Sequence, residues 1–468
     1  MSKRQKRKHI QGQRGEAFVE LIRGVPREQI ACVSIDVHKY YHQVMAHNEY
    51  GEILQASFRV DTFRAGFERL CSAIDDIVNT YNIQVLFIGM EPTGHYFENL
   101  ARHLGKRYPH VRLVNSYAVK ENRNQSMLRT EKTDDIDLAA IGDLTLHNKC
   151  FPYQPLKGDH LRLQHWVRFR DAKVKERTAL RNQVIGHLDR IFPGLVRPNR
   201  RPEFGGPPKL FAGFWKCLTA QRLIRLCPNP HRLLAMDADA LRQLFQVHNW
   251  RITRATAERI VHFVHLILLP DPEVVAARLP MLKLDLALLD LLDQTITETE
   301  EQIADSLSKT EGQVLVKVKG IGPIRAAAYV AGIGTPKHYE HAGQTFKRSG
   351  LVSGRKDSGL HQRQGAGHRI TKVGDRHLRK ALVEITRGLC QWQPYFAQYR
   401  ERLEQRGKHS GVATVATARK VNGVLFALMR DQSEFRPTDA RGRLVAPVHA
   451  IGDKQKAVTD IGSRKDSS

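Results

Sequence analysis

The stretch ACVSIDV, residues 31–37, followed by YHQVMAHNEYGEILQASFRV, residues 41–60, decides the fold of the first part of the chain. The first segment is a short apolar run that contains one acid, Asp36, and the second alternates like two strands joined at NEYG. This pattern predicts a buried strand followed by a β-hairpin. A carboxylate inside an apolar strand is costly without a partner, which makes Asp36 a candidate functional residue.

The next segments alternate between helical and strand patterns. Residues 62–81 carry apolar side chains at helical spacing, and QVLFIGM, residues 84–90, indicates a buried strand that ends on Glu91. Residues 94–104 indicate a further helix and residues 111–116 a further strand. A β meander followed by alternating helices and strands predicts a mixed sheet covered by helices.

A cluster of acids follows in EKTDDIDLAAI, residues 131–141. It has a structural explanation, because Thr133 is a good helix N-cap and acids in the first turn favour the helix dipole. Asp134 and Asp137 would also share one helix face with their Cβ atoms roughly 5–6 Å apart, where a divalent cation would relieve their repulsion. With the two strand acids, they could converge on one Mg²⁺ site that polarises a phosphodiester.

The chain is strongly basic. Its 468 residues contain 74 Lys and Arg against 48 Asp and Glu, a net charge of +26. This excess favours a polyanionic partner, with nucleic acid ahead of an anionic membrane surface. The run VHFVHLILL, residues 261–269, is about half of the ~20 residues that a membrane span needs, so we expect no membrane partner.

Other composition signals are mostly negative. No apolar stretch follows the basic start MSKRQKRKH, which therefore predicts an arm that contacts phosphate or is simply solvated, not a secretory signal. The 22 histidines form no HExxH motif or Cys/His cluster, so no zinc site is predicted. No CxxC pair occurs, and reduced thiols are expected for the six cysteines, Cys32, Cys71, Cys150, Cys217, Cys227 and Cys390.

Two long amphipathic segments, residues 158–192 and 281–308, dominate the middle of the chain. They could pair as an antiparallel coiled coil or be ordinary bundle helices. Further on, VKGIGPIRAAAYVAGIG, residues 318–334, indicates a helix-hairpin-helix. Its turn, at Gly320 and Gly322, could hold a phosphate at a helix N-terminus or only pack two helices together.

Residues 347–382 are dense in Arg, Lys and Gly and contain serines at 349, 353 and 358. A flexible basic loop of this kind usually binds phosphate passively, but an exposed serine in it could also attack a phosphodiester. The residues expected to contact phosphates are Arg355, Lys356, Arg369, Lys372, Arg376 and Arg379.

These motifs resemble a known family. Asp36 in SIDVHK, Glu91 in MEPTGHY and the aspartates of KTDDID resemble the DEDD, RuvC-like nuclease domain of insertion-sequence transposases of the "one-ten" family, which are related to the Piv/MooV DNA invertases. The segment SGL…DSG…RITKVGDRHLR resembles the second domain of that family, where the serine of a Ser-Gly pair is the nucleophile. By this resemblance the nucleophile is Ser358; Ser353 stands where many relatives have proline.

The resemblance implies a fold and a domain order. An α/β RNase H-like (RuvC-like) domain is expected at residues 30–155, a helical coiled-coil linker region with an insert at 156–312, and a mostly α-helical transposase domain with a helix-hairpin-helix at 313–432. A basic arm at 1–29 and a polar, disordered tail at 433–468 complete the prediction.

The resemblance also implies an RNA-guided serine recombinase that cuts and rejoins donor and target DNA through a phosphoserine intermediate. Mg²⁺ would be held by Asp36, Glu91, Asp134 and Asp137. The partners would be donor and target DNA, a structured noncoding bridge RNA and further copies of the chain in a dimer or tetramer. The expected location is the bacterial cytoplasm, at the nucleoid.

Other functions stay open on the sequence alone. A metal-dependent Holliday-junction resolvase or nuclease would use only the four acids and leave the serine idle. A non-catalytic nucleic-acid-binding protein would have the same positive charge. A Piv-type site-specific invertase differs from a transposase only in the biological outcome.

Overall fold

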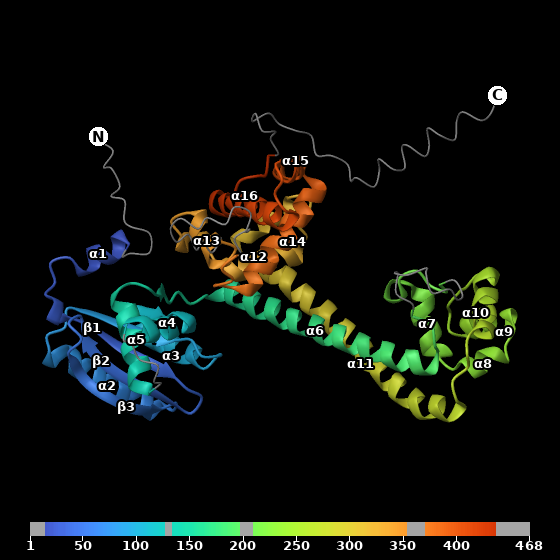
Figure 1. Ribbon diagram of the computed structural model, residues 1–468, viewed down its shortest axis with the longest axis horizontal. Helices are drawn as coiled ribbons and strands as arrows, with labels where there is room; N and C mark the ends of the chain where they lie inside the picture. The colour runs from blue at the N-terminus through green and yellow to red at the C-terminus, as the bar shows by residue number, and fades with distance from the viewer. Residues whose placement is uncertain (1–14, 127–132, 197–208, 353–369, 437–468) are drawn as a thin grey trace. The chain divides into compact units, whose positions relative to one another are not determined.

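The structure, a computed structural model, describes residues 15–126, 133–196, 209–352 and 370–436 (Figure 1). The chain forms two compact units, residues 1–155 and residues 156–468. The first unit contains the β-sheet, and the described part of the second is helical.

The first unit is built on a six-stranded mixed sheet with the strand order β3-β2-β1-β4-β5-β6. The strands are β1 (Ile30–Val37), β2 (Tyr41–Asn48), β3 (Ile53–Asp61), β4 (Val85–Glu91), β5 (Val111–Leu113) and β6 (Phe151–Pro152). β1 to β3 form the predicted antiparallel meander, whereas β4 pairs in parallel with β1 and β5 in parallel with β4. The predicted mixed α/β architecture is confirmed, and this topology is consistent with an RNase H-like fold.

Helices cover both faces of the sheet (Figure 1). α2 (Arg64–Thr80) and α3 (Phe97–Arg107) pack on one face, in a core with alternate strand residues such as Val33 and Ile35. α5 (Asp134–Leu146) lies on the other face, where α4 (Ser116–Ser126) packs beside it. The pleat therefore separates an apolar face from the face that carries Asp36, because side chains alternate along a strand.

Two glycines allow α5 to lie directly on the strands. A Cβ atom at Gly142 of α5 would stand 1.9 Å from Nε2 of His47, and one at Gly89 of β4 would stand 2.2 Å from Oγ1 of Thr145. No side chain fits at either contact without displacing its neighbour. This close approach fixes the C-terminal half of α5 against the sheet.

Gly142→Ala is therefore expected to lower the free energy of local opening of α5 by about 3 kcal/mol, since overpacking of a closed interface outweighs the better helix propensity of alanine. All four tryptophans lie outside this unit, so hydrogen exchange of the α5 amides is the suitable measurement. Gly105→Ala in α3 is the matched control, because its Cβ would meet only the Tyr153 ring at 3.6 Å. Equal protection of α5 in the two variants would contradict the packing argument.

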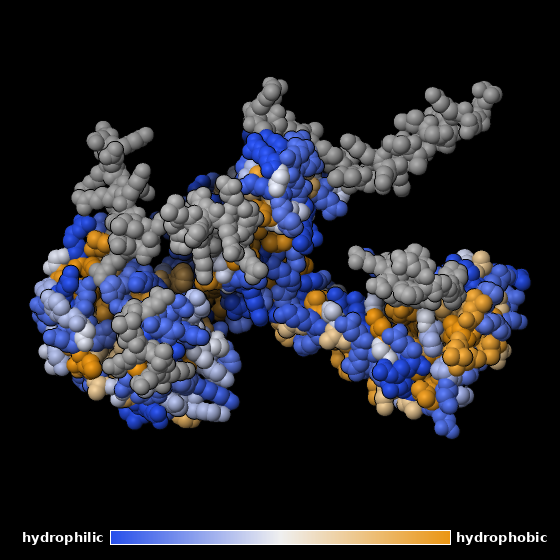
Figure 2. Space-filling view, viewed as in Figure 1, coloured by the Kyte–Doolittle hydropathy of each residue, from blue (hydrophilic) through white to orange (hydrophobic). Residues whose placement is uncertain are grey.

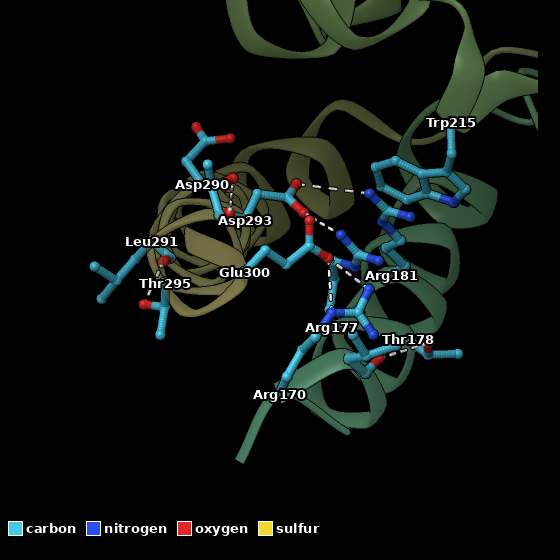
Figure 3. Close-up of polar contacts among 12 residues, drawn as sticks. Arg170, Arg177, Thr178, Arg181, Trp215, Asp290, Leu291, Asp293, Thr295 and Glu300 are labelled. Carbon is cyan, nitrogen blue, oxygen red and sulfur yellow. Dashed lines mark hydrogen bonds and ion pairs between the residues drawn. The ribbon is translucent and has the colours of Figure 1, made fainter. Parts of the chain in front are cut away.

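Two long helices that lie antiparallel organise the second unit. α6 (Gly158–Ile191) and α11 (Pro272–Ser308) are joined by Arg170–Glu300, with Nε to Oε1 at 2.7 Å, and by Arg177–Asp293, with Nη1 to Oδ1 at 2.7 Å (Figure 3). The residue number rises along one helix as it falls along the other, which is the predicted antiparallel direction.

α11 begins earlier than the predicted start at residue 281. It starts at Pro272 and continues through Pro280, which removes one backbone hydrogen bond from the helix. Val275 and Leu282, on either side of this proline, are both buried in one core. This packing on both sides of Pro280 explains why the helix continues beyond its predicted start.

An insert between the two long helices has a core of its own. It contains α7 (Leu218–Leu226), α8 (Pro230–Leu234), α9 (Ala238–Val247) and α10 (Arg254–Leu266), which pack with the ends of α6 and α11. Figure 2 shows apolar surface on this insert, and Leu218, Val247 and Leu268 are among its exposed side chains.

The rest of the second unit is a helical domain. Its helices are α12 (Pro323–Ile333), α13 (Ala342–Arg348), α14 (Arg376–Trp392), α15 (Pro394–Gln405) and α16 (Ser410–Asp431). Among the described residues, α16 is the one helix long and apolar enough to cross a membrane, which differs from the sequence expectation. Val421, Leu425 and Met429 of α16 are buried in the domain core, which explains its apolar character.

The segment predicted as a helix-hairpin-helix has a shorter first arm than expected. A 3-10 helix (Glu311–Lys317) precedes the turn, and α12 follows it with Gly322 as the N-cap. Gly320 has a φ of +107°, and a Cβ atom there would stand 2.9 Å from the carbonyl oxygen of Gly388. Backbone packing against α14 is thus sufficient to explain Gly320.

Parts of the predicted arm and of the predicted tail make ordered contacts. Part of the supposed arm, α1 (Glu16–Ile22), is a helix whose Phe18 ring stacks on Phe87 at 5.1 Å. At the start of the predicted tail, the Phe435 ring stacks on Phe396 with the ring centroids 6.3 Å apart. Short apolar anchors in polar surroundings give too weak a periodicity to be recognised in the sequence.

Candidate active site

A row of polar residues crosses one end of the sheet. Asp36 of β1 is in register with Glu91 of β4 on one side and with Gln43 of β2 on the other. Gln43 is in turn in register with Arg59 of β3, whose Nε donates to its Oε1 at 3.1 Å. Residues in register project to the same face, so the row lies on the face that α5 covers.

The acidic first turn of α5 lies beside this row. Oγ1 of Thr133 accepts a hydrogen bond from the backbone N–H of Ile136 at 3.3 Å, so the predicted N-cap is present. Oδ2 of Asp134 is 4.0 Å from Nη2 of Arg59. Asp137 is buried, whereas Asp135 is exposed. The helix-cap explanation is confirmed, and the acidic turn lies beside the polar row of the sheet.

The pKa of Asp36 is affected by burial and by its charged neighbours. Burial raises the pKa of Asp36, and the charges of Asp137 and Asp134 raise it further. His38, with Nε2 3.1 Å from Oδ2 of Asp36, opposes this shift. The ionised cluster is therefore a site of unfavourable negative charge that a cation would relieve.

An arginine already meets one of the acids. Nη1 of Arg123 in α4 lies 2.5 Å from Oδ1 of Asp137, and the two side chains are only 12% and 11% exposed. Glu91 ends β4 and is partly buried.

The four acids suit a hard divalent cation in type, because Mg²⁺ prefers carboxylate oxygens. Within the described ranges, no three His, Cys, Asp or Glu side chains stand where they could hold one ion together. The strand register places Asp36 beside Glu91, and the charges of Asp134 and Asp137 act on Asp36. Asp137 is paired with Arg123.

Sequence reasoning missed four residues at this site, His38, Gln43, Arg59 and Arg123. Gln43 and Arg59 could have been found from the hairpin register, because they stand opposite one another in the predicted strands. Arg123 gave no signal other than the need of a buried carboxylate for a counter-ion.

A second candidate region lies in the helical unit, where the described residues on either side of the basic segment 353–369 meet. The chain segments on either side of residues 353–369 are held together by backbone hydrogen bonds from Thr371 N to Val352 O at 2.9 Å and from Asp375 N to Arg348 O at 2.8 Å. Gly374 has a φ of +135°, and a Cβ atom there would stand 2.2 Å from the Arg348 carbonyl oxygen. These contacts form a closed backbone clamp.

Several predicted residues lie outside the described ranges, namely Ser358, Arg355, Lys356 and Arg369. Of the others, Lys372 is exposed in the clamp and Arg376 begins α14. Arg379 donates from Nη1 to the carbonyl oxygen of Ser349 at 2.9 Å, so it contributes to the clamp. Gly322 is exposed at the start of α12.

The first unit is thus a mixed sheet with acids at one end, consistent with an RNase H-like fold, and helical domains follow it. Two family models match the chain: the DEDD transposase model of the IS110 type matches residues 33–193, and the model of the transposase IS116/IS110/IS902 family matches residues 312–401. Together they include more than half of the residues. The chain belongs to the IS110 family of transposases.

Two curated relatives match more narrowly. A probable family 20 transposase of Pseudomonas aeruginosa is 31% identical over 153 residues, 32% of this chain and 44% of that protein. An uncharacterized 44.8 kDa protein of insertion element IS116 from Streptomyces clavuligerus is 27% identical over 150 residues, 31% of this chain and 36% of that protein. The chain thus aligns with less than half the length of these relatives.

Proposed function

We propose that the protein is a DNA transposase that cuts and rejoins donor and target DNA, guided by a structured RNA. The observation that carries this proposal is the in-register pair Asp36 and Glu91 beside the acidic first turn of α5. Four carboxylates in a chain of net charge +26 suit a metal ion held against a polyanion. Both matching family models name transposases, which supports the same class.

When bound, Mg²⁺ would act as a Lewis acid on the scissile phosphate. Asp36, Glu91, Asp134 and Asp137 are the residues that would hold it. Asp36 must be ionised for this role, and the nearby His38 side chain favours the ionised form. Arg59 and Gln43 extend the site along the sheet and offer donors to a phosphate oxygen.

Ser358 is the proposed nucleophile. Its Oγ forms a bond to phosphorus, the bond from phosphorus to the leaving DNA oxygen breaks, and that oxygen takes up a proton. A hydroxyl of a second strand then attacks the phosphoserine, a new phosphodiester forms, and the serine regains its proton. The phosphoester bond is conserved throughout, so rejoining needs no further energy source.

The active assembly is proposed to contain more than one copy of the chain. α11 exposes Met281, Leu284, Leu288 and Leu291 at the three- and four-residue spacing of a coiled-coil seam. Such a row on one helix face suits a second helix of the same kind. Light scattering of the protein with and without its guide RNA tests this, and a monomer in both samples would contradict it.

The function is tested with DNA carrying the ends of the encoding element and RNA transcribed from its non-coding end. Strand cleavage and joining are expected only with Mg²⁺ and this RNA, and EDTA is expected to stop both. Cleavage to free, hydrolysed ends without joining would instead indicate a junction resolvase or nuclease. Binding of DNA or RNA without any cleavage would indicate a non-catalytic binding protein.

A further inference from the structure

Arg123 reaches the acidic site from a firmly held helix. α4 packs against α5 through Val119, in one core with Ile141 and Leu144. Beside Arg123, Nδ2 of Asn122 donates to Oδ2 of Asp143 of α5 at 2.7 Å. The Arg123 guanidinium is therefore positioned by the packing of two helices and not by a flexible surface chain.

The contact between Arg123 and Asp137 is close but incomplete. One guanidinium nitrogen meets one carboxylate oxygen, at 2.5 Å. Nε of Arg123 is buried and has no hydrogen-bond partner. A bidentate arginine–carboxylate pair would use two donors and both oxygens. The pair therefore neutralises a buried charge, but it lacks the second hydrogen bond that would make the pair harder to open.

The Arg123 guanidinium lies where a bound cation would act on the acids. Asp137 contributes to the raised pKa of Asp36, so the charges of both acids act on the same region. A positive group next to Asp137 does for the metal-free site what a metal would do. A metal cannot take this oxygen of Asp137 while the guanidinium lies against it.

We propose that Arg123 is an internal counter-ion that competes with the divalent cation, and that metal binding requires the Arg123–Asp137 pair to open. This inference rests on the metal site of the proposed function. The released guanidinium would pair with a phosphate oxygen of the nucleic acid, since arginine binds carboxylate and phosphate with the same donor geometry. Metal loading and substrate binding would thereby favour each other.

Calorimetric titration of Mg²⁺ into the full-length protein tests the competition. Arg123→Ala is expected to bind Mg²⁺ roughly tenfold more tightly than the wild type, because the cation no longer has to displace a competitor. Arg107→Ala is the matched control, because Arg107 of α3 pairs with Asp75 of α2 in the same unit, on the face of the sheet opposite to the acids. Its effect on Mg²⁺ affinity is expected to stay within about twofold.

A second measurement can be made on the wild-type protein, so it does not require that the Arg123→Ala variant folds. In the wild type, Mg²⁺ is expected to reduce amide protection in α4 and increase it in the first turn of α5, measured by hydrogen exchange. In EDTA, Arg123→Ala is expected to lose protection in α5, because a buried carboxylate has lost its partner. Mg²⁺ is then expected to restore that protection.

The outcomes separate the two proposals. Equal Mg²⁺ affinity in the wild type and Arg123→Ala, with affinity lost in Asp137→Asn, would overturn the role of Arg123 and leave the metal site standing. No Mg²⁺ binding by the wild type or by Arg123→Ala would overturn the metal site, and this inference with it. If Arg123→Ala does not fold in Mg²⁺, unchanged protection of α4 in the wild type would overturn the competition.

Discussion

Ser358→Ala is expected to abolish the covalent protein–DNA adduct completely. An alanine cannot form the bond to phosphorus on which cleavage and rejoining both depend in the proposed mechanism. The measurement uses a DNA substrate nicked so that the cut strand diffuses away, with the trapped adduct resolved on a denaturing gel. Binding of the same DNA by the variant is expected to be unchanged, since only a hydroxyl is lost.

Ser349→Ala is the matched control for this prediction. Ser349 is fully buried; its Oγ donates to the carbonyl oxygen of Phe346 at 2.6 Å and accepts from the N–H of Leu351 at 3.3 Å. A hydroxyl with these two partners supports the loop clamp and is closed to substrate. Its loss is expected to cost about 1 kcal/mol of stability and leave adduct formation intact.

Two results would contradict the assignment. An adduct formed by Ser358→Ala would place the nucleophile elsewhere in the chain. Cut DNA with no adduct in the wild type would mean that water is the nucleophile. The second result favours the nuclease alternative, in which the four acids act alone.

The fold of the first unit could be predicted where one face of an element is buried. The alternation in residues 41–60 and the helical spacing in 62–81 gave the hairpin and α2, because each element places its apolar residues against one core. α4 was missed, since its sequence SYAVKENRNQS is mostly polar. The position of α4 depends on contacts with α5, including a charge pair that no local pattern encodes.

The acids of the site could be placed in order along the chain, but their environment could not. Asp134 and Asp137 fall in the first turn of a capped helix, as the spacing predicts, and Asp135 is exposed. That Asp36 stands in register with Glu91 depends on how β4 pairs with β1 across a long crossover. Strand register of this kind is set by the whole core, so periodicity alone does not give it.

Asp36→Asn is expected to reduce Mg²⁺-dependent DNA cleavage by on the order of 10³-fold, because a neutral amide is a poor ligand for Mg²⁺ and leaves the developing charge at the phosphate uncompensated. The assay is the initial rate of strand cleavage at saturating Mg²⁺. Asp135→Asn is the control, since Asp135 is an exposed acid in the first turn of α5, beside the proposed ligands Asp134 and Asp137. Its loss is expected to change the rate by less than about twofold.

Asp36→Asn is also expected to stabilise the metal-free protein. Burial raises the pKa of Asp36, so the folded protein holds this proton more tightly than the unfolded chain does. Stability therefore falls as the pH rises from the usual aspartate range through the raised pKa, and above that window the ionised carboxylate destabilises the fold.

Asn removes this charge, so in EDTA at neutral pH the Asp36→Asn variant is expected to show greater protection of β1 and α5 in hydrogen exchange. With Mg²⁺ present, the wild type is expected to show the greater protection, because only the wild type gains the free energy of Mg²⁺ binding. A variant that loses both cleavage and metal-free stability would show that Asp36 is needed for folding, and one that cleaves at the wild-type rate would exclude it as a ligand.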